Sequence, residues 1–160
     1  MYTTESQLFR WGIPTYIQTI FVDLTSTAEI KISDTLPTQM GWIYGLNTYA
    51  DGTDTDGTTL ISTANCLNLW WKIVQGDVNF IQKLRFSDLL YNVTNQGFRY
   101  YEVNIPGTIS LDQSLILNPT KITGVRLLMQ MHYIRLTDLV DLVYSKKVVM
   151  DNGFIRKIKS

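Results

Sequence analysis

Acidic side chains gather in one short polar segment, and they are the first residues of this sequence that could do chemistry. Asp51, Asp54 and Asp56 could offer carboxylate oxygens, the ligands that Ca²⁺ prefers. An EF-hand loop needs Gly at its sixth position and Glu at its twelfth. If Gly57 takes the sixth position, the twelfth is Thr63, so the motif fails. The segment therefore favours a solvated loop, with a calcium site as the weaker alternative.

Nucleophilic and acid–base groups are scarce. The sequence holds one histidine, His132, and one cysteine, Cys66. A lone histidine is more often a buried structural residue than a ligand, and a metal site of the cupin type needs two or three. A single cysteine also excludes a disulfide within the chain. We therefore predict no enzymatic activity and no cofactor.

Paired carboxylates of the glycosidase kind are also hard to find, because the only glutamates are Glu5, Glu29 and Glu102. A glycosidase needs two carboxyl groups facing each other across a cleft. Glu102 alternates with Tyr100 in an extended segment, so it could face a sugar, but a solvated sheet face is the favoured interpretation.

Composition favours one globular domain with a large core. The chain has 160 residues, 45% of them hydrophobic and 18% charged, with 14 basic and 14 acidic residues. A length near 150 residues suits a single domain. The zero net charge gives no global sign of a nucleic-acid or membrane partner, and it suits a subunit that assembles. Neither a signal peptide nor an apolar run of about 18 residues is visible, which predicts synthesis in a cytoplasm.

Residues 65–90 form the stretch around which the predicted fold is organised. Leu67, Leu69, Trp71 and Ile73 alternate with polar residues and with Trp70, as in a strand with one buried face. The segment 75–77 is a turn signal. After it, the alternation predicts a second strand with one face made of Val78, Phe80, Leu84 and Phe86. We expect a β-hairpin at the centre of a sheet.

Further short strands are expected on both sides of this hairpin. They are 16–24, 29–33, 40–49, 58–63, 100–105, one or two within 109–117, and 125–134. The last of these is apolar on both faces, which predicts a fully buried strand. In 40–49, Trp42, Tyr44 and Leu46 should share a face, and Gly45 could form a bulge. Helical spacing places Leu136, Leu139, Val140 and Val143 on one side and Asp138 and Asp141 on the other, which predicts a short helix, with a strand as the rival. The segment 148–155 reads as a second hairpin.

Eight to ten short strands at this spacing are typical of an all-β sandwich or barrel. We predict an antiparallel β-sandwich of jelly-roll type over residues 15–134. An apolar N-terminal arm (1–14) precedes it, and a basic C-terminal extension (135–160) follows it.

Two groups of side chains are the predicted contact residues. The first holds apolar and aromatic residues expected at an interface: Leu8, Phe9, Trp11, Trp42, Trp70, Phe154 and Ile155. The second is a basic tail: Lys146, Lys147, Arg156, Lys157 and Lys159. Such a tail can contact nucleic acid, anionic lipid or an acidic neighbour, or it can simply be solvated.

The whole pattern resembles the single jelly-roll capsid proteins of viruses and bacteriophages. An apolar arm precedes the first strand, the loops are rich in Thr, Asn, Asp and Gly, and the segments 12–14 and 104–107 are similar to those that lead into capsid strands. The resemblance covers roughly residues 15–134. It implies a minor capsid or penton-like subunit of a virion, which forms homo-oligomers and contacts other capsid proteins. It also implies no small-molecule substrate, and a tail that faces the genome or an internal membrane.

A second hypothesis is a carbohydrate- or receptor-binding module. Trp70, Trp42 and Tyr100 would serve as stacking platforms, and the 51–56 loop would hold calcium. This hypothesis requires that these aromatic side chains form one exposed row on a single copy of the chain.

Overall fold

The computed structural model describes residues 4–32, 36–52, 69–75, 77–86, 101–107, 109, 114–151 and 154–157. Within them lie two helices, α1 (Thr4–Arg10) and α4 (Leu136–Tyr144). The strands are β1 (Tyr16–Asp23), β2 (Glu29–Lys31), β3 (Met40–Gly52), β4 (Trp70–Gln75), β5 (Val78–Arg85), β6 (Tyr101–Pro106), β7 (Leu115–Leu117), β8 (Val125–Arg135), β9 (Val148–Asp151) and β10 (Phe154–Lys157). The strand expected at 58–63 lies outside the described residues.

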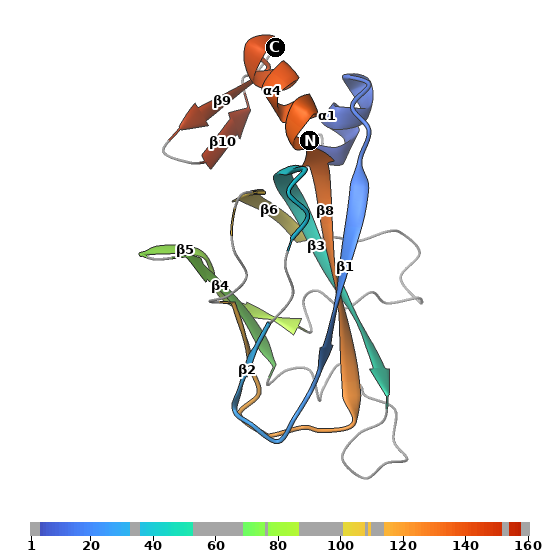
Figure 1. Cartoon of the computed structure of the whole chain (residues 1–160), viewed down its shortest axis with the longest axis vertical. Coiled ribbons are helices and arrows are strands. Elements are labelled where there is room, and N and C mark those ends of the chain that lie inside the picture. Colours follow the sequence, from blue (N-terminus) through green and yellow to red (C-terminus); the bar gives the residue numbers. More distant parts are fainter. Residues whose placement is uncertain are drawn as a thin grey trace.

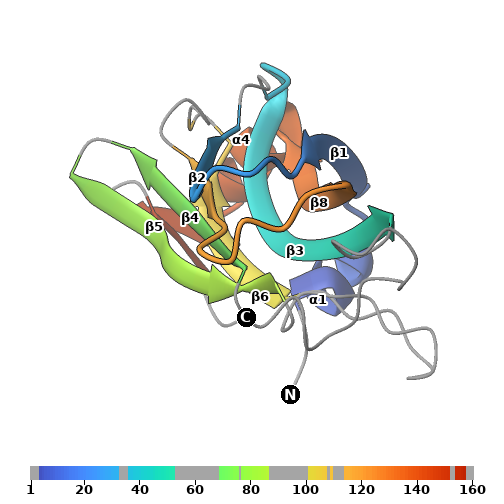
Figure 2. The same ribbon diagram turned by 90° about the horizontal axis from the view of Figure 1, so that it is seen from below.

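The pairing of the first eight strands defines the fold. β1 pairs with β8, β2 with β7, β3 with β6 and β4 with β5, always antiparallel. The four pairs are nested, so the eight strands follow the path of one long hairpin whose turn lies between β4 and β5. Rolling it up sets β3 beside β8 and β4 beside β7, and gives two sheets with the orders β1-β8-β3-β6 and β2-β7-β4-β5. This is a jelly-roll sandwich, so the predicted fold is confirmed (Figures 1 and 2).

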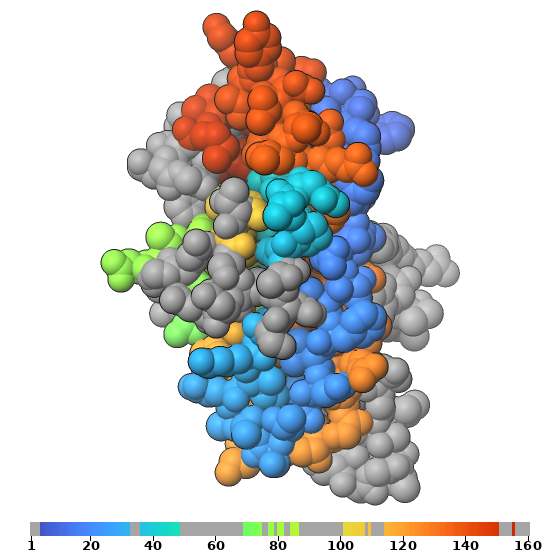
Figure 3. All heavy atoms as spheres, viewed as in Figure 1, coloured from blue at the N-terminus to red at the C-terminus, as the bar shows by residue number. Residues whose placement is uncertain are grey.

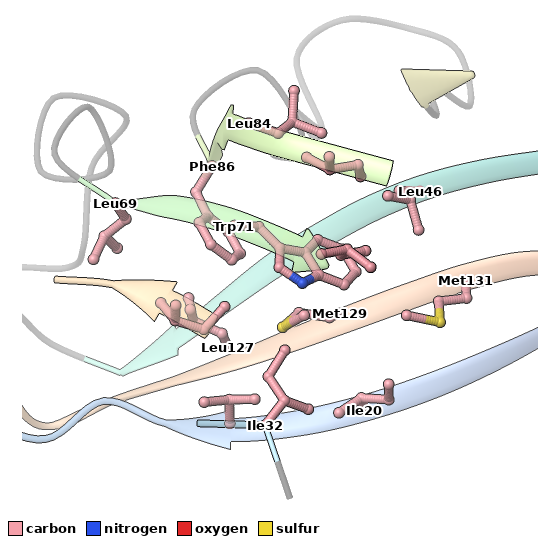
Figure 4. Packing of buried hydrophobic residues seen from close by; sticks show 14 of the residues in the cluster. Ile20, Ile32, Leu46, Leu69, Trp71, Leu84, Phe86, Leu127, Met129 and Met131 are labelled. Carbon is pink, nitrogen blue, oxygen red and sulfur yellow. The ribbon is translucent and has the colours of Figure 1, made fainter. Parts of the chain in front are cut away.

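One apolar core fills the space between the two sheets. Alternate residues of β1 and β8 point into it, namely Ile20, Val22, Leu127, Met129 and Met131. From the opposite sheet, Trp71 stacks on Phe86 with ring centroids 6.4 Å apart. Figure 4 shows the Trp71 ring between Phe86 and the β8 methionines. Both aromatic rings are fully buried, so they contribute a large share of the apolar area removed from water.

The predicted hairpin exists as β4 and β5, and its first strand has the expected faces. Leu69, Trp71 and Ile73 are buried, whereas Trp70 and Lys72 are only partly covered. Its place in the sheet differs from the prediction, because β5 stands at the end of the order β2-β7-β4-β5. The strands with the most extensive pairing are instead β3 and β8 of the other sheet.

The predicted inner face of β5 is wrong at its start. Val78 is exposed and Phe80 only partly buried, whereas Ile81 is buried. The cause is a shift of register: Trp71 lies opposite Leu84, but Ile73 lies opposite Ile81. A second shift follows, because the next residue, Val74, lies opposite Asn79. Each shift places one extra residue on β5 and breaks the regular alternation of faces along that strand.

A second irregularity lies at Gly45, where the sequence suggested a bulge. The pairing of β3 with both β6 and β8 shifts between Ile43 and Gly45. As a result, Trp42 and Tyr44 point to one face of the sheet, while Leu46 points with Ile43 into the core between the sheets. The expectation that Leu46 shares a face with Trp42 and Tyr44 was therefore wrong, because the bulge moves it to the opposite face.

The outer face of this sheet carries a second apolar cluster at one end. It is made of Leu8, Trp42, Tyr44, Ile134, Leu139, Leu142, Val148 and Ile155, with Trp11 and Ile13 packed against it. The covering elements are α1, α4 and the antiparallel hairpin β9–β10, which we call the cap (Figure 1). Both terminal segments thus fold back on their own sandwich.

The cap also explains the burial of β8. We predicted that β8 is buried on both faces, and its residues from Met131 to Ile134 are indeed buried. Nearer its start, Arg126 is exposed and Leu128 is only partly covered. The part of β8 outside the cap is therefore buried on one face only, which corrects the prediction for 125–130.

Candidate assembly surface

Helix α4 begins directly where β8 ends, and backbone contacts hold it against β3. The N–H of Leu136 donates to the carbonyl of Gln39 (2.7 Å). At the other end, the N–H groups of Lys146 and Lys147 donate to the carbonyls of Val143 and Leu142. This is a Schellman ending, although Lys146 rather than glycine takes the left-handed conformation (φ 62°). The helix is therefore fixed at both ends.

The sequence of α4 is apolar around most of its circumference, yet only one side is buried. Leu139 and Leu142 pack into the cap cluster. The exposed fractions of the outward residues are 40% for Leu136, 57% for Val140, 38% for Val143 and 90% for Tyr144. We call these four residues the α4 stripe. Exposed apolar residues grouped on one face of a helix are typical of surfaces at which proteins contact one another, so the stripe is the candidate contact surface.

The helix predicted at 136–143 is confirmed, but its assumed buried face is not. The spacing of Leu136, Leu139, Val140 and Val143 suggested that these residues face the protein together. Instead, Leu139 turns inward with Leu142, and the other three face outward. Leu139 and Leu142 lie three positions apart on one side of the helix, and that side contacts the cap cluster.

Phe9 adds to the exposed apolar surface of the cap. It lies on α1, next to the fully buried Leu8, and 84% of its surface is exposed. Both helices pack on the same cluster, and Figure 3 shows their atoms together at one end of the molecule. That end therefore carries apolar side chains on two separate elements.

Charged groups surround the stripe. Asp141 and Lys146 are exposed, and Asp138 is partly covered. Within the described part of the chain, none of these three has an ion pair. Lys147 instead places its ammonium over the Trp11 ring, 5.6 Å from the centroid. The helix thus carries two carboxylates, and a lysine lies just beyond its C-terminal end.

Strand β1 exposes a smaller apolar strip, made of Ile17 and Phe21. Next to it, Asp23 accepts two hydrogen bonds from Arg126, at 2.7 Å from Nε and 3.2 Å from Nη2. The hydrogen bond from Arg126 lowers the pKa of Asp23 below its usual value. This strip lies on the edge strand of its sheet and outside the cap cluster.

The predicted interface residues fall into three groups. Leu8, Trp42 and Ile155 are buried within the chain, so they support the cap and do not reach its surface. Phe9 is exposed, while Trp11 and Trp70 are partly covered. The side chain of Phe154 lies outside what the structure describes. Of the predicted interface residues whose side chains are described, Phe9 is the most exposed.

The row of aromatic residues that a carbohydrate module would need does not include Trp42. Its ring is buried in the cap cluster, edge-on to Tyr44 with centroids 6.4 Å apart. Trp70 lies on the other sheet and is partly covered, and Tyr100 lies outside the described residues. Trp42 and Trp70 therefore do not share a surface.

The basic tail is described only in part. Lys146 is exposed and Lys147 partly covered. Arg156 and Lys157 lie in β10 with side chains that are not described, and Lys159 lies beyond the described residues. The structure therefore places two of the five predicted basic side chains, both at the end of α4.

Most of the predicted acidic loop also lies outside the described residues. Asp51 lies in β3, while Asp54 and Asp56 are not described. Among the described residues, no three His, Cys, Asp or Glu side chains are grouped closely enough to hold a metal ion. Nor does any helix in this part of the chain have the length and apolar character that crossing a bilayer requires.

His132 is buried on the outer face of its sheet, inside a polar network. Its Nε2 hydrogen-bonds Oδ1 of Asn47, whose Nδ2 donates to Oε1 of Gln130 (2.9 Å). The ring lies 6.1 Å from that of Tyr44. Burial lowers the pKa of His132 to about 4, so the imidazole is neutral at pH 7. These contacts make it a structural residue that joins β3 to β8.

The α4 stripe was not among the site residues predicted from the sequence. A signal was present, because six of the nine residues from Leu136 to Tyr144 are apolar or aromatic. This apolar share is larger than a surface helix with one buried side needs. Which side would be left outside depends on the cap, whose parts come from both ends of the chain.

Comparisons with protein-family models, with curated proteins and with solved structures found no match to this chain.

Proposed function

We propose that this chain is a structural coat subunit of a virus particle, acting by association with copies of itself and with other coat proteins. The jelly-roll topology supports this proposal, because the fold is one that viral capsid proteins use. The same fold also serves lectins and cupins, so the topology alone does not choose among them.

The observation that carries the proposal is the exposed apolar surface of the cap. The α4 stripe and Phe9 leave five large apolar or aromatic side chains in water at one end of the molecule. Exposed apolar surface of this kind favours contacts between proteins. A sugar-binding platform is supported less, since Trp42 is used inside the cap.

The role as a minor capsid or penton-like protein is the finer part of the proposal. A subunit at a symmetric vertex offers surfaces to its own copies and to different neighbours. Among the described residues, the cap surface and the β1 strip of Ile17 and Phe21 are exposed apolar areas that lie apart from each other. Two areas suit a subunit that is contacted on more than one side.

Electron microscopy of the purified chain tests the proposal. At high concentration we expect closed rings or shells. Val140→Asp places a charge in the centre of the stripe and should abolish them. Thr120→Asp adds the same charge at an exposed turn outside the cap and should leave them unchanged. Single separate molecules from the wild-type chain, or particles that Val140→Asp leaves intact, would contradict the proposed function.

A further inference from the structure

Strand β1 leaves its sheet with an open edge. In the order β1-β8-β3-β6, β1 pairs with β8 alone among the described strands (Figure 2). The register between them runs without a break from Tyr16 to Asp23. An edge strand presents a row of unpaired N–H and C=O groups, which can pair with a strand of another molecule.

The other three edges of these two sheets carry features that hinder such pairing. β2 is only three residues long, and its Glu29 and Lys31 are exposed. β5 is interrupted by two shifts of register. β6 is bound by the cap, because the side chain of Asn104 hydrogen-bonds both the N–H and the carbonyl of Ile155 in β10. Short strands, charges, bulges and covering segments all protect edges. Strand β1 itself is longer and unbulged, and its residues 16–22 include no charge and no proline.

One backbone hydrogen bond shows which residues of β1 face the open edge. The N–H of Leu24 donates to the carbonyl of Val125 (2.8 Å), in line with the register between β1 and β8. Backbone groups of successive residues point alternately to the two sides of a strand, so those of the even-numbered residues face β8. The N–H and C=O groups of Ile17, Thr19 and Phe21 therefore point to the open edge.

A second copy of β1 fits this edge in one antiparallel register. Residues that face the edge must meet residues that face it, so Thr19 can lie opposite Thr19 of the other copy. Ile17 then lies opposite Phe21 on both sides of the axis, and these exposed side chains share one face. Asp23 lies opposite Thr15, which keeps the two Asp23 carboxylates at opposite ends of the ladder. A shift of two residues in one direction would instead set Ile17 against Asp23.

We propose that two copies of this chain join by antiparallel pairing of their β1 strands, around a two-fold axis at Thr19. This contact rests on the proposed function, of which it names one interaction between copies. It joins two four-stranded sheets into one continuous sheet across the dimer. Because the same edge serves both partners and the described edges elsewhere are protected, the pairing closes at a dimer and does not continue into a fibre.

Cysteine cross-linking tests the position of the axis. In a Cys66→Ser background, Thr19→Cys should form a disulfide-linked dimer, because Cα atoms in a hydrogen-bonded antiparallel pair lie about 5.5 Å apart. Thr120→Cys is the matched control, since Thr120 is exposed at a turn outside β1. Ile17→Cys and Phe21→Cys chains should cross-link faster when mixed than either does alone. A Thr19→Cys chain that cross-links no faster than Thr120→Cys would overturn the proposal.

Charge substitutions at Thr19 test the self-pairing independently. Thr19→Lys and Thr19→Glu each set like charges opposite one another at the axis, so each should raise the dissociation constant of the dimer about tenfold at low salt. An equimolar mixture of the two should recover the dimer, because opposite charges then face each other. Thr19 is only partly covered, and circular dichroism checks that both variants fold. A mixture that associates no more tightly than either variant alone would count against β1 pairing.

The outcome separates this inference from the proposed function. If Thr19→Cys fails to cross-link while light scattering still shows an oligomer, the β1 contact is wrong and self-association stands. If the chain is a monomer at every concentration, both are contradicted.

Discussion

At the scale of single residues, β3 holds two neighbouring buried polar side chains that differ in their hydrogen bonding. Asn47 has its amide in hydrogen bonds to His132 and Gln130. Thr48, the next residue, is fully buried toward the core, and its hydroxyl has no hydrogen-bond partner among the described residues. A buried polar group without a partner destabilises the fold, since water no longer satisfies it.

Replacing Thr48 by Val should therefore stabilise the protein. The side chains have the same shape, and the change removes the unpartnered hydroxyl. We expect the free energy of unfolding to rise by about 1 kcal/mol, measured by urea denaturation. Thr27→Val is the control, because its hydroxyl is exposed and donates to the Glu29 carbonyl. A loss of stability in Thr48→Val would show that this hydroxyl is hydrogen-bonded.

His132 should make the stability depend on pH. Burial lowers its pKa in the folded state to about 4, below the 6.5 of the free side chain. Between these values the unfolded chain binds the proton more readily, so stability falls as the pH is lowered from about 6.5 to about 4. Thermal unfolding across this range measures the effect. His132→Gln should flatten the dependence, and an unchanged slope would contradict this account of His132.

Residue chemistry was only partly predictable from the sequence. The structural role of His132 was expected from its isolation, and its burial bears this out. The faces of Leu46 and Val78 were not, because each depends on a bulge that the pairing with another strand creates. Alternation along a single strand cannot show such a shift.

At the scale of elements, the position of α4 depends on one glycine of β3. A Cβ on Gly41 would lie 2.7 Å from Cα of Leu136 and 2.8 Å from the carbonyl oxygen of Arg135. Both are backbone atoms, which cannot turn aside as a side chain can. The first turn of α4 therefore packs directly on the backbone of β3.

Gly41→Ala should detach the start of α4 from the sandwich. We expect the free energy of unfolding to fall by about 2 kcal/mol or more, because the helix must move and uncover part of the cap cluster. Hydrogen exchange should show faster exchange in α4, while β1 and the middle of β8 stay protected. Gly12→Ala is a useful comparison, since a Cβ there meets no atom within 4 Å and only the positive φ is strained. Unchanged exchange in α4 would contradict this role of Gly41.

The elements themselves were largely predictable, since strands and helix are local patterns. Alternation located β1, β4 and β6, and the 3.6-residue period located α4. Their partners are not local. The pairing of β1 with β8 joins residues more than 100 positions apart, as in Asp23 and Arg126, and no spacing in the sequence encodes it.

At the scale of the whole molecule, two apolar layers share one sheet. The core between the sheets closes the sandwich, and the cap covers the outer face at one end. The cap leaves the α4 stripe and Phe9 in water. The described part of the chain thus buries two apolar clusters and still exposes apolar surface on the cap.

The most direct test of the central claim is the mass of the chain in solution, measured by light scattering over a wide range of concentrations. We predict a discrete oligomer that dissociates on dilution, and a shift toward monomer in Val140→Asp. A wild-type chain that remains a monomer at the highest concentration would contradict the claim that it acts by self-association.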